Sequence, residues 1–126
     1  MGVIFAIMKV FPSAKQQAQV AEILRTVQDL TRPSPGCMGC WLTEESFPLP
    51  HLRYAEQWES EDALHEHLQS SLYHRVLAAM ELSTRQPEVA YYFTSHERGF
   101  DLIEEARGSA EGKETNQPQA RSRSGI

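Results

Sequence analysis

Several features are scarce in this sequence of 126 residues, and each absence narrows the possible functions. The 12 Lys and Arg residues are outnumbered by 17 Asp and Glu residues, which gives a net charge of -5. We therefore expect no nucleic-acid partner, because proteins that hold phosphates present a basic patch. No apolar run reaches the about 20 residues of a membrane span, so we also expect no membrane association. The N-terminus lacks the charged region of a signal peptide, and a cytoplasmic protein is expected.

Cysteine is also scarce, and the two that are present, Cys37 and Cys40, are too few for a zinc site. Their C-x-x-C spacing is typical of redox sites in which the motif opens a helix. Here the pair follows a turn and begins a predicted strand, where residues three apart face opposite sides. A disulfide would need a bulge at Gly39. We expect two free thiols that pack as small hydrophobic side chains.

The signatures of several enzyme classes are missing as well. The chain has no Gly-rich phosphate loop and no G-x-S-x-G nucleophile motif. The histidines of His65-Glu66-His67 are two apart, whereas a helical zinc motif places them four apart. The residues themselves therefore predict no metal site and no nucleotide site.

What remains is an alternation of apolar strand patterns and amphipathic helix patterns. Strands are predicted at 3–11, 37–46, 52–58 and 88–95. Helices are predicted at 13–30, 60–69, 72–83 and 97–107, with the second and third separated at Ser70-Ser71. The order β-α-β-β-α-β predicts an α+β, ferredoxin-like domain with an antiparallel sheet over residues 1–107. Residues 108–126 are polar and rich in Gly and Ser, so we expect a disordered tail.

The first strand is apolar on both faces, with Phe5 and Ile7 on one side and Ile4 and Met8 on the other. A strand of this kind is covered on both faces. Helices cover one face of such a sheet, and another layer must cover the second face. A second copy of the chain can supply that layer, which predicts a homodimer.

The stretch 53–68 organises the rest of the chain. Period-two alternation places Tyr54, Glu56 and Trp58 on one side of a strand, which turns at once into a helix. Ser60 is the expected N-cap, and His67 lies on the helix face that packs on the sheet. A pocket between this strand and this helix is predicted. In the next helix, we expect a buried side made of Tyr73, Val76, Leu77 and Met80.

The pattern Glu-x-Trp-x-Ser, then an acidic helix start and His-Leu-x-Ser, resembles the antibiotic biosynthesis monooxygenase family. The resemblance covers roughly residues 3–95 and implies a homodimeric α+β barrel. It also implies an oxygenase without a metal or flavin cofactor, whose partners are O2 and a small phenol or quinol. The alternative is a non-catalytic dimer of the same fold, either a small-ligand-binding protein or a stress-related one.

His67 is the candidate catalytic residue, because an imidazole can take or give a proton near neutral pH. The alternative is a structural histidine that packs on the sheet and bonds to a tyrosine. His65 is expected to face solvent, and His74 shares the His67 side only if the helix is unbroken. Tyr54 and Trp58 either contact substrate or belong to the core. The predicted substrate-binding residues are Phe5, Ile7, Tyr54, Trp58 and Tyr92.

Haem-degrading members of the family provide a contrast. They carry an Asn on the first strand, a Trp in the pocket helix and a His ligand ten residues later. This chain has Ile7, His67 and Leu77 at the matching positions. The resemblance therefore implies no haem cofactor here.

Overall fold

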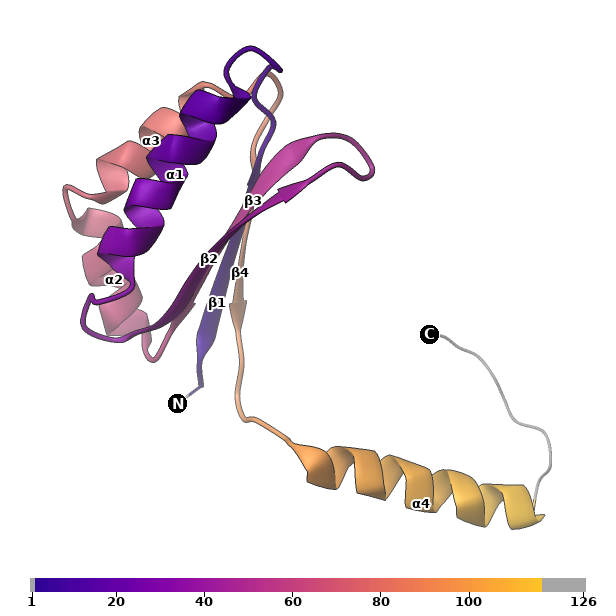
Figure 1. Ribbon diagram of the computed structural model, residues 1–126. Helices are drawn as coiled ribbons and strands as arrows, with labels where there is room; N and C mark the ends of the chain where they lie inside the picture. The colour runs from indigo at the N-terminus through magenta and orange to yellow at the C-terminus, as the bar shows by residue number, and fades with distance from the viewer. Residues whose placement is uncertain (1, 117–126) are drawn as a thin grey trace. The chain divides into compact units, whose positions relative to one another are not determined.

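The computed structural model describes residues 2–116, and its helices and strands follow the predicted order (Figure 1). The strands are β1 (Ile4–Val10), β2 (Cys37–Glu45), β3 (His51–Trp58) and β4 (Glu88–Phe93). The helices are α1 (Gln17–Thr31), α2 (Glu61–Gln69), α3 (Tyr73–Glu81) and α4 (Phe100–Asn116). The strands pair antiparallel in one sheet of order β2-β3-β1-β4, which confirms the ferredoxin-like α+β prediction.

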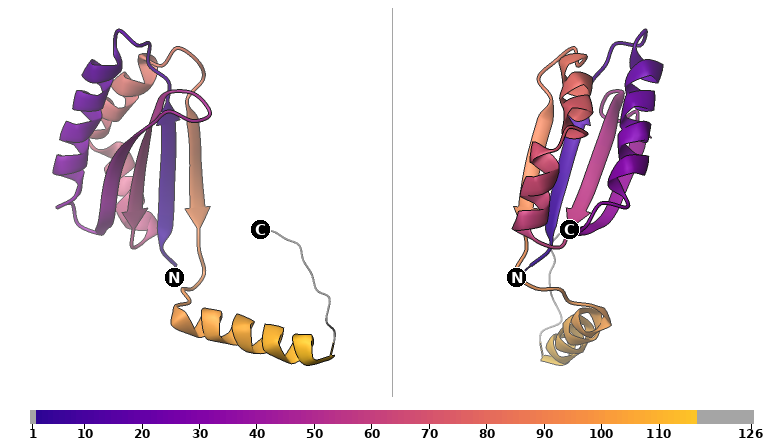
Figure 2. Two further views of the ribbon diagram at one scale, coloured as in Figure 1. Left: turned by 45° about the vertical axis from the view of Figure 1, so that its right-hand side comes forward. Right: turned by 90° about the vertical axis from the view of Figure 1, so that its left-hand side faces the viewer.

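Helices α1, α2 and α3 cover one face of this sheet, as Figures 1 and 2 show. Within residues 2–96, no helix lies on the opposite face, which we call the open face. The core fills the space between the sheet and the helices, where Val20, Leu24 and Val27 of α1 are fully buried. In the register of β1 and β3, Ile4 pairs with Trp58 and Met8 with Tyr54, so these side chains point into that core.

The turn between α1 and β2 is packed closely against the start of α2. Gly36 has a positive φ of 84°, a conformation that only glycine adopts without strain. A Cβ on Gly36 would also collide with the side chain of Ala63. The Gly36 carbonyl accepts a hydrogen bond of 2.9 Å from the Glu59 N–H. The turn is therefore held against the β3–α2 junction.

Strand β2 contains a bulge before Gly39, which was considered above only as a requirement for a disulfide. Its register with β3 shifts between Cys37 and Gly39. Cys37 pairs with Trp58 and Cys40 with Glu56, so both cysteines lie on the helix-covered face. The prediction that they face opposite sides was wrong, because the extra residue of a bulge reverses the alternation. Both thiols are free in the structure.

Helices α2 and α3 are separate, as predicted from Ser70-Ser71. Ser70 has extended backbone angles, and its Oγ donates a hydrogen bond of 2.7 Å to the His67 carbonyl. His74 is exposed, in agreement with the broken-helix alternative.

The buried side of α3 differs in part from the prediction. Val76 and Ala79 are buried, and Tyr73 and Met80 are partly buried, but Leu77 is 44% exposed. Expecting Leu77 to be buried was wrong. It lies about 100° around the helix from Val76 and therefore falls outside the face that packs on the sheet.

The chain divides into two compact units, Met1–His96 and Glu97–Ile126. In the second unit, Arg98 bonds to Asp101 at 2.7 Å and to Glu105 at 2.6 Å at the start of α4. The helix was predicted to end at residue 107, with disorder from 108, but it continues to Asn116. Ala, Glu and Lys recur after residue 107, and all three favour helix. The rest of the predicted tail, 117–126, lies outside the described residues.

None of the helices in residues 2–116 combines the length and the apolar character that a membrane-spanning helix needs.

Candidate functional site

A buried carboxylate lies at the centre of the candidate site. Glu56 on β3 has only 3% of its side chain exposed. Its Oε2 accepts a hydrogen bond of 2.7 Å from the Tyr54 hydroxyl and lies 2.8 Å from His67 Nε2. Its Oε1 accepts a bond of 2.8 Å from the Trp58 indole N–H. A carboxylate so deeply buried needs such partners, and here three side chains provide them.

Local sequence explains how these groups meet. Alternation along β3 places Tyr54, Glu56 and Trp58 on the helix-covered face. Helix α2 follows directly, and its N-cap Ser60 accepts a hydrogen bond of 3.2 Å from the Ala63 N–H. Two helical turns later, His67 faces back toward β3.

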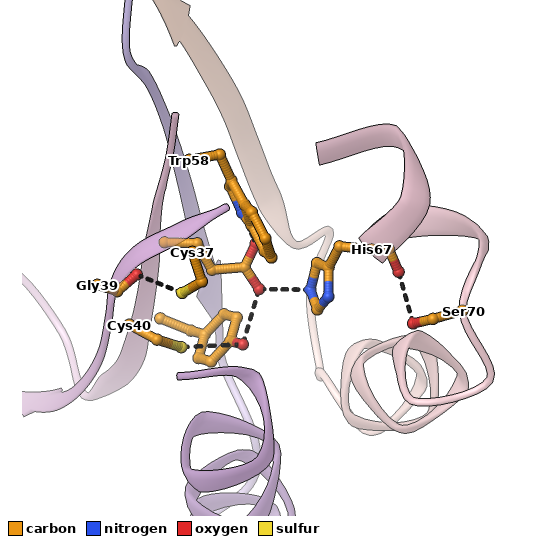
Figure 3. Close-up of polar contacts among 8 residues, drawn as sticks. Cys37, Gly39, Cys40, Trp58, His67 and Ser70 are labelled. Atoms are coloured by element: carbon orange, nitrogen blue, oxygen red, sulfur yellow. Dashed lines mark hydrogen bonds and ion pairs between the residues drawn. The ribbon is translucent and has the colours of Figure 1, made fainter. Parts of the chain in front are cut away.

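The His67 ring is held by aromatic neighbours as well as by Glu56. Its centroid lies 4.8 Å from the Trp58 ring and 5.4 Å from the Tyr73 ring, which meets it edge-on. Figure 3 shows His67 pointing from its helix toward the sheet, with Trp58 beside it. The side chain of His67 is 3% exposed. The ring is therefore fixed in one orientation.

The hydrogen bonds extend from Glu56 through Tyr54 to Cys40. The Cys40 thiol donates to the Tyr54 hydroxyl oxygen at 3.2 Å. Burial raises the pKa of the Cys40 thiol to about 12, and burial together with the nearby Glu56 charge raises the pKa of Tyr54 above its usual value. Both groups thus keep their protons at neutral pH and act as donors in a chain that ends on Glu56.

A second buried histidine provides a useful contrast. His51 Nδ1 lies 2.8 Å from the Leu49 carbonyl oxygen, and its Nε2 lies 2.9 Å from Glu45 Oε1. Both ring nitrogens have hydrogen-bond partners. They link the start of β3 to Leu49 in the loop and to Glu45 at the end of β2. His51 is therefore a structural residue that closes this hairpin.

His67 differs, because its ring makes one hydrogen bond, through Nε2, within the described part of the chain. Among the described residues, Thr31 Oγ1 is the only buried side-chain oxygen or nitrogen that lacks a partner. His67 Nδ1 also has no partner, but it is not one of these fully buried atoms. It therefore reaches accessible surface.

His67 lines a pocket of about 210 Å³, which we call the His67 pocket. A cavity of about 150 Å³ is enough for benzene, so a single aromatic ring fits this space. The turn before β2, helix α2 and the α2–α3 junction form its walls. The lining residues are Ser34, Pro35, Trp58, Ala63, Glu66, His67, Ser70 and Leu72.

Glu56 borders a different, much smaller cavity of about 10 Å³, which His67 does not line. It has room for about one water molecule and no more. Tyr73 and Tyr91 border it, and burial raises the pKa of Tyr73, with further contributions from the nearby Tyr91 hydroxyl. Tyr54 and Glu56 therefore do not open onto a substrate-sized space in this structure.

The predicted site residues fall into two groups. Tyr54 and Trp58 lie with His67 on the helix-covered face, whereas Phe5 pairs with Tyr92 on the open face. Ile7 lies on the same face of β1 as Phe5, the open face, and it also borders the small cavity. The structure does not bring the five predicted substrate-binding residues to one pocket of this chain. His65 is exposed, as expected.

Glu56 is the site residue to which the sequence analysis assigned no role. The available signal was its position between Tyr54 and Trp58 on the covered face of a strand. A carboxylate at such a position must find donors, and Tyr, Trp and His are donors. In the described residues, no three His, Cys, Asp or Glu side chains gather as metal ligands would.

Solved structures of similar fold come from several organisms. Rv0793 from Mycobacterium tuberculosis is 24% identical, with a TM-score of 0.68, and the match covers 77% of this chain and 99% of that one. A conserved protein from Methanosarcina mazei is 18% identical, with a TM-score of 0.68 and coverages of 75% and 95%. A structure described as an antibiotic biosynthesis monooxygenase is 18% identical, with a TM-score of 0.65 and coverages of 74% and 99%.

A comparison with curated proteins found no match. A comparison with protein families found one that covers β1 to most of α3: residues 3–79 match the family described as Antibiotic biosynthesis monooxygenase. The matched segment contains Tyr54, Glu56, Trp58 and His67, and it makes up more than half of the chain. This chain therefore belongs to the antibiotic biosynthesis monooxygenase family.

Proposed function

We propose that this protein is a monooxygenase that oxidises a small phenol or quinol with O2, without a metal or flavin, and that His67 is its proton acceptor. Family membership supports the reaction class. The observation that carries the proposal is the His67 side chain, which lines the His67 pocket and has its Nε2 held by buried Glu56. A histidine in this state can accept a proton from a bound hydroxyl group.

The reaction balances without an external reductant. A phenol and O2 give a quinone and water, and a quinol and O2 give a hydroxyquinone and water: in both cases one oxygen atom enters the ring, and the other leaves as water. The ring supplies all four electrons. The protein must bind the substrate, remove the phenolic proton to increase the electron density of the ring, and keep bulk water away. Pro35, Ala63 and Leu72 contribute apolar surface to the pocket.

We also propose that the protein is a homodimer, paired through the open face. An apolar row crosses all four strands in register on that face, formed by Trp41, Ala55, Ile7 and Ala90. Trp41 is 43% exposed, and the neighbouring Phe5 and Tyr92 are 36% and 54% exposed. A second copy of the same sheet matches this surface in size and character. Pairing would bring Phe5 and Tyr92 into a closed interior.

A second candidate function is small-ligand binding without chemistry. The nearly complete burial of His67 and the water-sized cavity beside Tyr54 favour it. The two functions use the same pocket and differ only in turnover.

The test is oxygen uptake with a panel of quinols, comparing wild type with His67→Ala. Turnover per folded protein should fall by about 10²–10⁴-fold, the usual contribution of a positioned base. Because His67 is buried, its loss should also cost about 2–3 kcal/mol of stability, so thermal melts accompany the assay.

His65→Ala is the matched control. His65 lies on the same helix, is 59% exposed, and makes only a surface ion pair of 3.5 Å with Glu61. Such a pair contributes little, so His65→Ala should turn over like wild type. Equal turnover of the two variants would exclude His67 as the base. Quinols that bind without oxygen uptake would favour the second candidate function.

A further inference from the structure

We propose that Glu56 is a positioning residue: it holds His67 in the tautomer with the proton on Nε2 and leaves Nδ1 as the basic atom at the His67 pocket. This inference rests on the proposed function, which it deepens by assigning the atom that accepts the proton. Glu56 itself does not line the His67 pocket.

The donors to Glu56 fix the direction of each hydrogen bond. The Trp58 indole N–H can only donate, and it donates to Oε1 at 2.8 Å. The Tyr54 hydroxyl oxygen already accepts from the Cys40 thiol, so its own proton is free to point at Oε2, 2.7 Å away. Two donors therefore reach Glu56 before His67 is considered. An ionised carboxylate is the form that accepts them all.

The third contact then fixes the imidazole. Nε2 of His67 lies 2.8 Å from Oε2, and a carboxylate that only accepts requires a proton on that nitrogen. In a neutral ring, the lone pair is consequently on Nδ1. The Trp58 and Tyr73 rings lie against the imidazole and block its rotation. The lone pair on Nδ1 therefore points in one fixed direction.

Glu56 is also the charged neighbour of the ring. Its carboxylate oxygen lies 2.8 Å from His67 Nε2. Other titratable groups near the ring are Tyr54 on β3, Tyr73 on α3, Cys37 and Cys40 on β2, and Glu66 on the pocket wall. Burial raises the pKa values of the two tyrosines and two thiols, so they stay neutral near pH 7. Glu56 is thus the charged group in direct contact.

The experiment is Glu56→Gln in the full chain, with the His67 ring followed by long-range ¹H–¹⁵N correlation NMR. Wild type should show a protonated Nε2 and an unprotonated Nδ1. The Gln amide can donate to Nε2 and so favours the opposite tautomer, which should appear in the variant. We expect kcat to fall by about 10²-fold or more with little change in KM.

Glu61→Gln is the control, because it removes a carboxylate from a histidine on the same helix at an exposed site. Its His67 spectrum and turnover should match wild type. A wild-type His67 with its proton on Nδ1, or an unchanged His67 spectrum in Glu56→Gln, would overturn the inference. If Glu56→Gln does not fold, the wild-type spectrum alone decides. The expected tautomer without turnover on any quinol would refute the proposed oxygenase and leave the positioning role standing.

Discussion

Glu56→Ala should be among the most destabilising single changes in this domain. The carboxylate accepts three hydrogen bonds, and all three donor side chains, Tyr54, Trp58 and His67, are buried. Alanine accepts none of them. The change would leave three buried donors without a partner. It would also remove the Glu56–His67 hydrogen bond that links β3 to α2.

The magnitude follows from those donors. A buried polar group left unpaired costs about 1–3 kcal/mol. The carboxylate leaves space next to a cavity of about 10 Å³, so a water molecule can enter and bond to some of the donors. We therefore expect a loss of about 3–5 kcal/mol. For a domain of about 100 residues, this corresponds to a fall of about 15–30 °C in Tm.

The assay is urea and thermal denaturation followed by Trp fluorescence, at one fixed protein concentration because pairing would affect stability. Glu56→Gln is the reference, since it keeps the shape and one acceptor, and it should lose only about 1–2 kcal/mol. A loss below about 1 kcal/mol for Glu56→Ala would refute the central place given to these hydrogen bonds. So would an equal loss in both variants.

Two further predictions concern assembly and pH. Phe5→Glu, which places a charge on the open face, should convert a dimer to monomers in sedimentation velocity; a wild-type protein that is already monomeric would contradict the dimer. Cys40 and Tyr54 have folded pKa values raised above their ordinary 9.0 and 10.0, so above about pH 9 the unfolded chain releases protons that the folded chain keeps. Stability should then fall as pH rises from 9 toward 12, by up to about 1.4 kcal/mol per pH unit for each group. The urea midpoint measured at successive pH values tests this, and a flat curve from pH 8 to 11 would count against the buried thiol and phenol.

Much of the fold could be predicted because its signals are local. The alternation of Tyr54, Glu56 and Trp58 indicated both the strand and its covered face. Ser60 and Ser70 marked where helix α2 begins and ends. The site itself was harder, because both faces of β1 are apolar. Nothing in that strand indicates that Ile4 and Met8, and not Phe5 and Ile7, share the face of Trp58.

The remaining differences have physical causes that composition does not reveal. The bulge in β2 adds one residue between Cys37 and Gly39, and it reverses the side on which Cys37 lies. Leu77 is apolar, yet it falls outside the buried face of α3. The role of Glu56 depends on three donors at once, one of which comes from a helix 11 residues later. Hydrophobic periodicity predicts which face of a strand or helix is buried. It does not predict which buried polar side chains form hydrogen bonds with one another.

The direct passage from β3 into α2 has a consequence for how this protein can change during evolution. Glu56 and His67 belong to one short, continuous segment, so their geometry depends little on distant parts of the chain. Much of the wall around them comes from elsewhere, namely the Ser34–Pro35 turn and the residues that lead into α3. Substitutions in that wall can reshape the pocket without moving Glu56 and His67. Under the proposed function, substrate preference and proton transfer would be separable traits, inherited on different stretches of one sequence.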